Sequence, residues 1–110
     1  MAFRVLFLAH APDADPEKHR SVIETGNYKL YSLVVKNQSQ AVKECKTLVA
    51  EESIHSIILC PGFTHRSVAE IVEAAGRNVV VSVARGDGPS NRLSAEIRKR
   101  ELRKGGAEKG

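Results

Sequence analysis

Residues 60–67, which read Cys-Pro-Gly-Phe-Thr-His-Arg-Ser, contain the residue types best suited to chemistry in this chain of 110 residues. The thiol of Cys60 ends an apolar run typical of a strand, and Val68–Ala75 has the apolar spacing of a helix. Thiolates are nucleophilic, and the N-terminus of a helix together with a nearby arginine stabilises the thiolate form. Arg66 and Ser67 are therefore candidates to hold a phosphate above Cys60, with the guanidinium as an anion clamp.

The spacing from Cys60 to Arg66 and Ser67 resembles the phosphate-binding loop of protein tyrosine phosphatases. The residues that follow resemble the low-molecular-weight branch of that family and the related arsenate reductases. The resemblance implies that Cys60 is a nucleophile, Arg66 the phosphate clamp and Ser67 a hydroxyl that stabilises the thiolate. It also implies Asp87 as the general acid, although Gly88 here separates that aspartate from the proline that directly follows the family's acid.

The same residues also allow a purely structural interpretation. Ser67 and Glu70 have the spacing of a capping box, and Thr64 is a second candidate N-cap for this helix. If the helix begins at Thr64, the turn after Cys60 is too short to cradle a phosphate. Cys60 is then a small apolar residue at the end of a buried strand.

A loop at residues 10–20 gathers further ionisable side chains. His10 ends the first predicted strand, and Asp15 is the expected cap of the helix that follows. His19, together with His65 of the later loop, is a candidate proton carrier or hydrogen-bond donor to a ligand. These side chains lack the His-x-x-x-His or Cys-x-x-Cys spacing of a metal site, so neither a metal nor another cofactor is predicted.

The last loop, residues 85–92, contains a third set of candidates. Arg85 offers a fork to a carboxylate or a phosphate, and the two glycines around Asp87 let the backbone approach a ligand closely. Ser90 is a candidate ligand contact at the start of the last helix. A plain turn into that helix is the alternative interpretation of the same residues.

Four strand-like segments alternate with four helix-like segments along the chain. The segments with strand character are Phe3–Ala9, Leu30–Val35, Ile57–Cys60 and Val79–Ala84. The predicted helices run from Asp15 to Gly26, over Ala41–Val49, over Val68–Ala75 and from about Ser90. Strands that are apolar on both faces predict a parallel sheet covered by helices on each side. The sequence thus predicts one α/β domain over residues 1–104, with a disordered basic and Gly-rich tail at 105–110.

The predicted architecture has three layers around a doubly wound, four-stranded parallel sheet of order 2-1-3-4, flavodoxin-like or Rossmann-like. Ligands of such sheets bind beyond the carboxyl ends of the strands, where the strand order reverses. The three loops described above follow the first, third and fourth strands, so they are expected to meet in one pocket. Its predicted lining is His10, Asp15, His19, Cys60, His65, Arg66, Ser67, Arg85, Asp87 and Ser90.

The composition narrows the class of protein. A hydrophobic share of 42% and a charged share of 27% are ordinary for a soluble globular chain, and no apolar run reaches the length of a membrane span. The net charge of +4 comes from residues 85–110, which hold eight Lys/Arg and four Asp/Glu. No aromatic residue interleaves with these basic residues, which argues against a nucleic-acid partner. Two cysteines and no export signal predict a cytoplasmic protein without a structural disulfide.

Across nearly its whole length the chain resembles a family of small bacterial and archaeal α/β proteins of unassigned function. Residues 11–20 and 60–65 carry this resemblance, which implies a shared fold and a shared crevice but no reaction. The sequence therefore predicts that a small anionic ligand, bearing a phosphate or a carboxylate, binds at the carboxyl edge of the sheet. If the protein is an enzyme, His/Asp acid–base chemistry is expected there. Two alternatives stay open: a phosphatase or arsenate-reductase-like enzyme using Cys60, Arg66 and Asp87, and a non-catalytic ligand sensor or homodimeric module.

Overall fold

The structure is a computed structural model that describes the backbone of residues 2–109 and the side chains of residues 2–102. The predicted tail at 105–110 lies outside the fully described residues and stays a prediction. The elements follow in the order β1 (Phe3–His10), β2 (Arg20–Glu24), β3 (Tyr28–Val35), α1 (Gln38–Glu52), β4 (Ser56–Leu59), α2 (His65–Ala75), β5 (Val80–Val83) and α3 (Gly88–Lys109).

The five strands form one mixed sheet in the order β2-β3-β1-β4-β5. The central strand, β1, pairs in parallel with β3 on one side and with β4 on the other, and β5 pairs in parallel with β4. Only β2 runs antiparallel, alongside β3. The predicted order of the four parallel strands is confirmed, and the fold is a single small α/β domain with an extra strand at one edge.

The helix predicted from Asp15 to Gly26 is wrong. The chain makes a single turn in which the N–H of His19 donates to the carbonyl of Asp15 (2.8 Å), and it then becomes strand β2. Thr25 explains the change, because its Oγ1 accepts from the N–H of Tyr28 (3.0 Å) and its own N–H donates to the carbonyl of Tyr28 (2.8 Å). This tight turn reverses the direction of the chain, so β2 and β3 form a hairpin. Val22 and Ile23, two adjacent β-branched residues, favour the strand conformation in β2.

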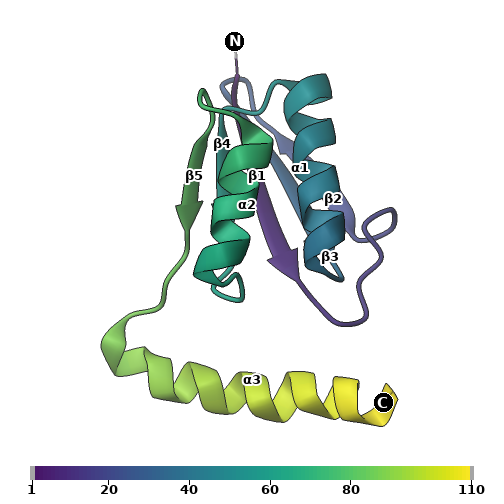
Figure 1. The fold of residues 1–110 in the computed structure, drawn as a ribbon, viewed down its shortest axis with the longest axis vertical. Coiled ribbons are helices and arrows are strands. Elements are labelled where there is room, and N and C mark those ends of the chain that lie inside the picture. The colour runs from purple at the N-terminus through teal and green to yellow at the C-terminus, as the bar shows by residue number, and fades with distance from the viewer. Residues whose placement is uncertain (1, 110) are drawn as a thin grey trace.

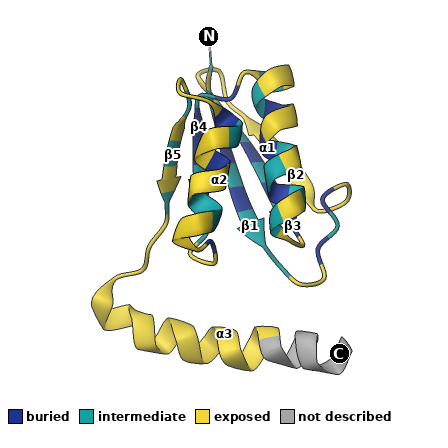
Figure 2. Ribbon diagram, viewed as in Figure 1, coloured by how far each residue is buried: buried dark blue, intermediate teal, exposed yellow. Residues whose placement is uncertain are grey.

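The loss of that helix changes the number of layers. Helices α1 and α2 lie side by side on the same face of the sheet, and α3 lies beyond the carboxyl ends of the strands, apart from either face (Figure 1). Residues 88–102 of α3 are exposed throughout (Figure 2). The predicted three-layer, doubly wound arrangement is therefore wrong for the described part of the chain, which has two layers.

The hydrophobic core lies between the sheet and helices α1 and α2. Its fully buried side chains come from β1, β3, β4, α1 and α2, as in Leu8, Leu59 and Ile71. Phe63, between β4 and α2, is 1% exposed and is the largest fully buried side chain. Because a packed interior tolerates few voids, Phe63 holds the loop after β4 against the core.

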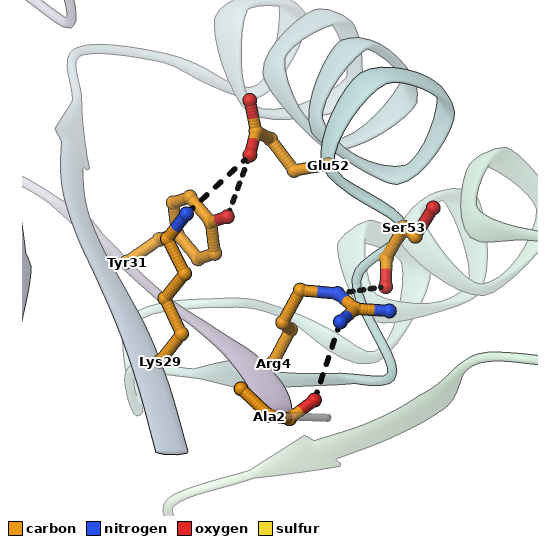
Figure 3. Close-up of polar contacts among 6 residues, drawn as sticks. All are labelled: Ala2, Arg4, Lys29, Tyr31, Glu52 and Ser53. Atoms are coloured by element: carbon orange, nitrogen blue, oxygen red, sulfur yellow. Dashed lines mark hydrogen bonds and ion pairs between the residues drawn. The ribbon is translucent and has the colours of Figure 1, made fainter. Parts of the chain in front are cut away.

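Polar contacts fasten the opposite edge of the sheet, where the strands begin (Figure 3). The guanidinium of Arg4 donates from Nε to the carbonyl of Ser53 (3.0 Å), at the end of α1. Glu52 accepts a hydrogen bond from the hydroxyl of Tyr31 (2.7 Å) and lies 3.9 Å from Nζ of Lys29. These contacts set the position of α1 relative to β1 and β3 and leave the carboxyl edge free of them.

Helix α2 begins at His65, with Thr64 as its N-cap. The Thr64 hydroxyl oxygen accepts from the N–H of Ser67 at 3.0 Å, which satisfies one of the free donors of the first turn. Of the two candidate caps in the sequence, Thr64 is the one used. Ser67 lies inside the first turn of the helix.

The capping arrangement predicts different effects for two hydroxyl deletions. Thr64→Ala removes the cap and is expected to lower the free energy of unfolding by about 1 kcal/mol. Ser67→Ala is expected to cost less than half of that, because its backbone N–H is the capped group and stays in place. Urea unfolding of both variants followed by circular dichroism measures the difference. A larger loss for Ser67→Ala would place the start of the helix at Ser67.

Candidate functional site

The loops after β1, β4 and β5 lie together at one edge of the sheet. The N–H of Cys60 donates to the carbonyl of Leu8 (3.0 Å), which ties the end of β4 to the end of β1. The guanidinium of Arg85 donates from Nη1 to the carbonyl of Phe63 (3.4 Å), which ties the loop after β5 to the turn after β4. Parallel pairing places the carboxyl ends of these strands at the same edge, so the loops that leave these ends also lie there.

A pocket of about 460 Å³ opens at this edge. Its walls come from the ends of β1, β3 and β4 and from one side of α3. The lining residues are Ala9, His10, Ala11, Pro12, Lys36, Cys60, Pro61, Gly62, Arg98 and Leu102. The volume lies within the range of roughly 300–1,000 Å³ that is usual for small-molecule sites.

A tight turn brings Cys60 and His10 together at the pocket. The N–H of Phe63 donates to the carbonyl of Cys60 (3.3 Å), with Pro61 and Gly62 as the two central residues. A Cβ placed on Gly62 lies 3.5 Å from Sγ of Cys60 and 3.9 Å from Nδ1 of His10. Because Gly62 has no side chain, the thiol and the imidazole both border the same open space.

His10 is held by stacking and lacks a polar partner on one side. Its ring lies on the ring of Phe63, with centroids 4.1 Å apart and planes 23° from parallel. Its Nε2 is buried and makes no hydrogen bond within the described part of the chain. Burial lowers the pKa of His10 below its usual 6.5, so the ring is neutral at pH 7. A buried polar atom without a partner costs about 1–3 kcal/mol, and Nε2 of His10 bears such a cost in the free protein.

Two cations complete the pocket. Lys36 directly follows β3, where its N–H donates to Oε1 of Gln40 (2.8 Å), and Arg98 comes from α3. Neither side chain forms an ion pair with another described residue, and no carboxylate is among the residues that line the pocket. The pocket therefore combines a mostly apolar wall with a positive rim, which attracts anions.

Two predicted residues of the first loop stabilise a turn and do not line the pocket. Oδ1 of Asp15 accepts from the N–H of Glu17 (3.0 Å), and the N–H of Asp15 donates to Nδ1 of His19 (2.9 Å). Both hydrogen bonds stabilise the short turn before β2, and the side chain of His19 is exposed. The polar groups of Asp15 and His19 stabilise this loop. Their position in the sequence alone did not show that they lie away from the pocket.

The three predicted residues of α2 also lie outside the pocket. Because the helix begins at His65, Arg66 and Ser67 are in its first turn, with His65 and Arg66 exposed to solvent. The turn from Cys60 to Thr64 is too short to wrap around a phosphate and to place Arg66 over the thiol. A phosphate-binding loop like that of a phosphatase is therefore not formed here, because Thr64 caps the helix and shortens the turn after Cys60.

The last loop contributes a tether and no lining residue. Arg85 is engaged by the carbonyl of Phe63, and the N–H of Ser90 donates to the carbonyl of Asp87 (3.0 Å) at the start of α3. All three side chains are exposed. This supports the plain-turn interpretation of residues 85–92.

Of the lining residues that sequence reasoning did not single out, Lys36, Gly62, Arg98 and Leu102 contribute most to the charge and shape of the pocket. Lys36 could have been found, because it directly follows a predicted strand whose carboxyl end had to lie at this edge. Gly62 was part of the recognised motif but was not considered as an open place in the wall. Arg98 and Leu102 had no indication in the sequence, because the position of α3 depends on a linker and not on the sheet.

No group of three His, Cys, Asp or Glu side chains in residues 2–102 is arranged to hold a metal ion. No helix in the described part is both long enough and apolar enough to cross a membrane.

Comparison with protein families matches residues 3–99 to a family described as "Family of unknown function (DUF6506)". No curated protein and no solved structure matches this chain. The phosphatase resemblance of residues 60–67 therefore has no support from these comparisons, and the whole-chain resemblance to a family of unassigned function does.

The two cysteines are predicted to differ in reactivity. Cys45 is fully buried on α1, and burial raises the pKa of its thiol to about 12, whereas Cys60 is partly exposed at the pocket. We expect iodoacetamide to modify one thiol in the native protein and two after unfolding, because alkylation requires an accessible thiolate. Mass spectrometry of the wild type and of Cys60→Ser measures this. Modification of Cys45 in the native Cys60→Ser variant would contradict the buried position of α1.

His10 is predicted to make stability depend on pH. Its pKa in the folded state lies below the unfolded value, so between the two values the unfolded state binds more protons. The free energy of unfolding therefore falls as the pH is lowered through 6.5 toward the folded pKa, and the contribution is complete above 6.5. We expect His10→Gln to lose less stability than the wild type between pH 7.5 and 5 in urea titrations. His65→Gln, at an exposed position, is the control, and a wild-type pH profile in His10→Gln would refute the assignment.

Proposed function

The chain belongs to the family of unknown function DUF6506, and we propose that it binds a small anionic molecule, bearing a phosphate or a carboxylate, in the pocket between β1, β3, β4 and α3. The observation that carries the proposal is the set of polar groups at this pocket. Lys36 and Arg98 have no ion-pair partner among the described residues, and Nε2 of His10 is buried without a hydrogen bond. An anion in the pocket pairs with the two cations and lies beside the ring of His10.

The ligand is amphipathic in this proposal. Its charged group lies toward Lys36 and Arg98, while its carbon skeleton contacts the apolar wall. That wall is formed by Ala9, Ala11, Pro12, Pro61 and Leu102. Both cations are exposed, so salt screens them and each contributes at most about 1 kcal/mol. Burial of the apolar part then supplies a comparable share of the affinity.

His10 gives the binding a direction with pH. Its pKa is lowered by burial in the free protein, and an anion placed beside the ring favours the imidazolium form. Binding therefore takes up a proton, and affinity rises as the pH falls. Of the acid–base residues predicted from the sequence, only His10 and Cys60 line the pocket, so the proposal is for binding and assigns no reaction. Both cysteines are free, which suits the cytoplasmic location proposed from the sequence.

The binding test uses phenyl phosphate as probe and phenol as its neutral counterpart. In ¹H–¹⁵N spectra we expect millimolar phenyl phosphate to shift the amides of Ala11, Lys36 and Gly62. Phenol should shift them far less, because it lacks the charge that the rim attracts. The response to phenyl phosphate should shrink when salt is raised. Equal responses to the two compounds, or no response at these amides, would refute an anion site.

Matched variants locate the site. Gly62→Ala places a methyl group at ordinary contact distance from Cys60 and His10, so it is expected to fold normally and to weaken phenyl phosphate binding several-fold. Gly26→Ala, which meets no atom within 4 Å in the β2–β3 turn, is its control. Lys36→Gln should also weaken binding several-fold, with Lys43→Gln on the exposed side of α1 as control. Unchanged binding in both pocket variants would move the site elsewhere.

A further inference from the structure

The face of the sheet opposite α1 and α2 has no covering element in the described part of the chain (Figure 1). Strand side chains alternate between the two faces, so the residues that alternate with the core positions form this second surface. We name it the open face. It consists of Phe3, Val5, Phe7, Ala9, Ser21, Ile23, Tyr28, Leu30, Ser32, Val34, Ser56, Ile58, Val80 and Ser82.

No residue of the open face is charged, although charged residues make up 27% of the chain. All charged residues of the strands lie on the face that the helices cover. The ion pairs of Arg20 with Glu44 on α1 and of Lys29 with Glu52 are examples. Several apolar side chains of the open face are widely exposed in the single chain, with Phe3 at 50%, Ile23 at 60% and Val80 at 60%. A sheet face that stays in water alternates with polar and charged residues, and this one does not.

Parallel strands are ordinarily covered on both faces. Here four of the five strands are parallel, and the element that would have covered the second face, a helix between β1 and β3, is replaced by the edge strand β2. An uncovered apolar surface of this extent in a small protein marks an interface.

Helix α3 of the same chain does not suit this surface. Its apolar side chains at adjacent turns are Leu93 and Ile97, which are 59% and 39% exposed. The rest of its described surface is dominated by charge, from Arg92, Glu96, Arg98, Lys99, Arg100 and Glu101. Laying this helix on fourteen uncharged residues would remove several of these charges from water without partners, which is costly.

We propose that the open face packs against the open face of a second copy of the chain, in a two-fold symmetric dimer. A surface without charge meets itself without repulsion and without removing an ion from water, which is the requirement for a self-complementary interface. Ser32 and Phe7 lie side by side near its centre, with Ser21 and Ile58 next to them in the same row. Two sheets stacked about 10 Å apart interdigitate such side chains.

The size of the open face agrees with a dimer. Strands of up to eight residues, at about 3.3 Å per residue and about 4.8 Å between strands, outline on the order of 500 Å² on each copy. Within this outline Val5 and Ser56 are already buried in the single chain, at 1% and 9% exposed, so the other twelve residues supply the accessible area. Specific interfaces bury roughly 600–1,000 Å² per partner, so the flat outline comes close to the lower end of that range. The pocket lies at the carboxyl edge of the sheet and shares only Ala9 with the open face, so the dimer and the anion site are tested independently.

A charge at the centre of the open face tests the proposal. Sedimentation equilibrium of the wild type over a wide concentration range is expected to give 24 kDa, twice the 12.0 kDa of one chain. Ser32→Glu places a carboxylate beside Phe7, and burying it unpaired at the interface should weaken dimerisation at least about a hundred-fold. Ser39→Glu makes the same change at an exposed position in the first turn of α1 and should leave the dimer intact.

The outcomes separate this dimer from other arrangements. A monomeric Ser32→Glu with the far-ultraviolet circular dichroism of the wild type supports the proposal, because the fold is then retained and only the association is lost. A wild type that sediments as a 12.0 kDa monomer at all concentrations overturns it. A Ser32→Glu variant that stays dimeric like Ser39→Glu also overturns it, since the interface must then lie on another surface.

Discussion

The parallel pairing of β1 with β3 and β4 is the constraint on which the candidate site depends. This pairing fixes Leu8 opposite Leu33 on one side and Leu59 on the other, so the three strands end together. The hydrogen bond from the N–H of Cys60 to the carbonyl of Leu8 extends the ladder by one step into the loop. His10, Lys36 and Cys60 are therefore neighbours because of the register of their strands, although they come from separate parts of the chain.

The sequence identifies those parts of the fold that depend on local apolar pattern. The four parallel strands and helices α1 and α2 are recognisable because their apolar residues recur with the period of their own structure. The segment from Asp15 to Gly26 misled because Asp-Pro and a terminal glycine are helix signals, whereas the pairing of Arg20–Glu24 with β3 is a long-range interaction. Helix α3 was recognised as a helix, but its place relative to the sheet follows from an exposed linker that carries no pattern.

The same division holds at the site. The rule that ligands bind at the carboxyl edge of the sheet identified His10 and Cys60. It also applies to Lys36, which directly follows a strand, but this residue was not considered because its side chain did not suggest catalysis. The rule failed at Asp15 and His19 because their polar atoms accept from backbone N–H groups nearby, those of Glu17 and Asp15. It failed at Ser67 because this residue lies in the first turn of α2, where its hydroxyl oxygen accepts from the hydroxyl of Thr64. A polar side chain next to a turn or a helix start satisfies backbone groups first, and its type does not reveal which role it has.

The open face and the shape of the pocket have a common cause in the hairpin of β2 and β3. A helix between β1 and β3 would have covered the second face, and its start would have packed against the carboxyl edge next to His10. Strand β2 instead extends the sheet sideways, which leaves this face uncovered in the described part of the chain and leaves the edge bounded by loops and α3. In the proposed dimer, the uncharged composition of that face has a physical explanation, because a charge buried between the two sheets would lose its water without gaining a partner. The turn closed by Thr25, in place of a helix continuing to Gly26, thus shapes both the open face and the loop edge that borders the pocket.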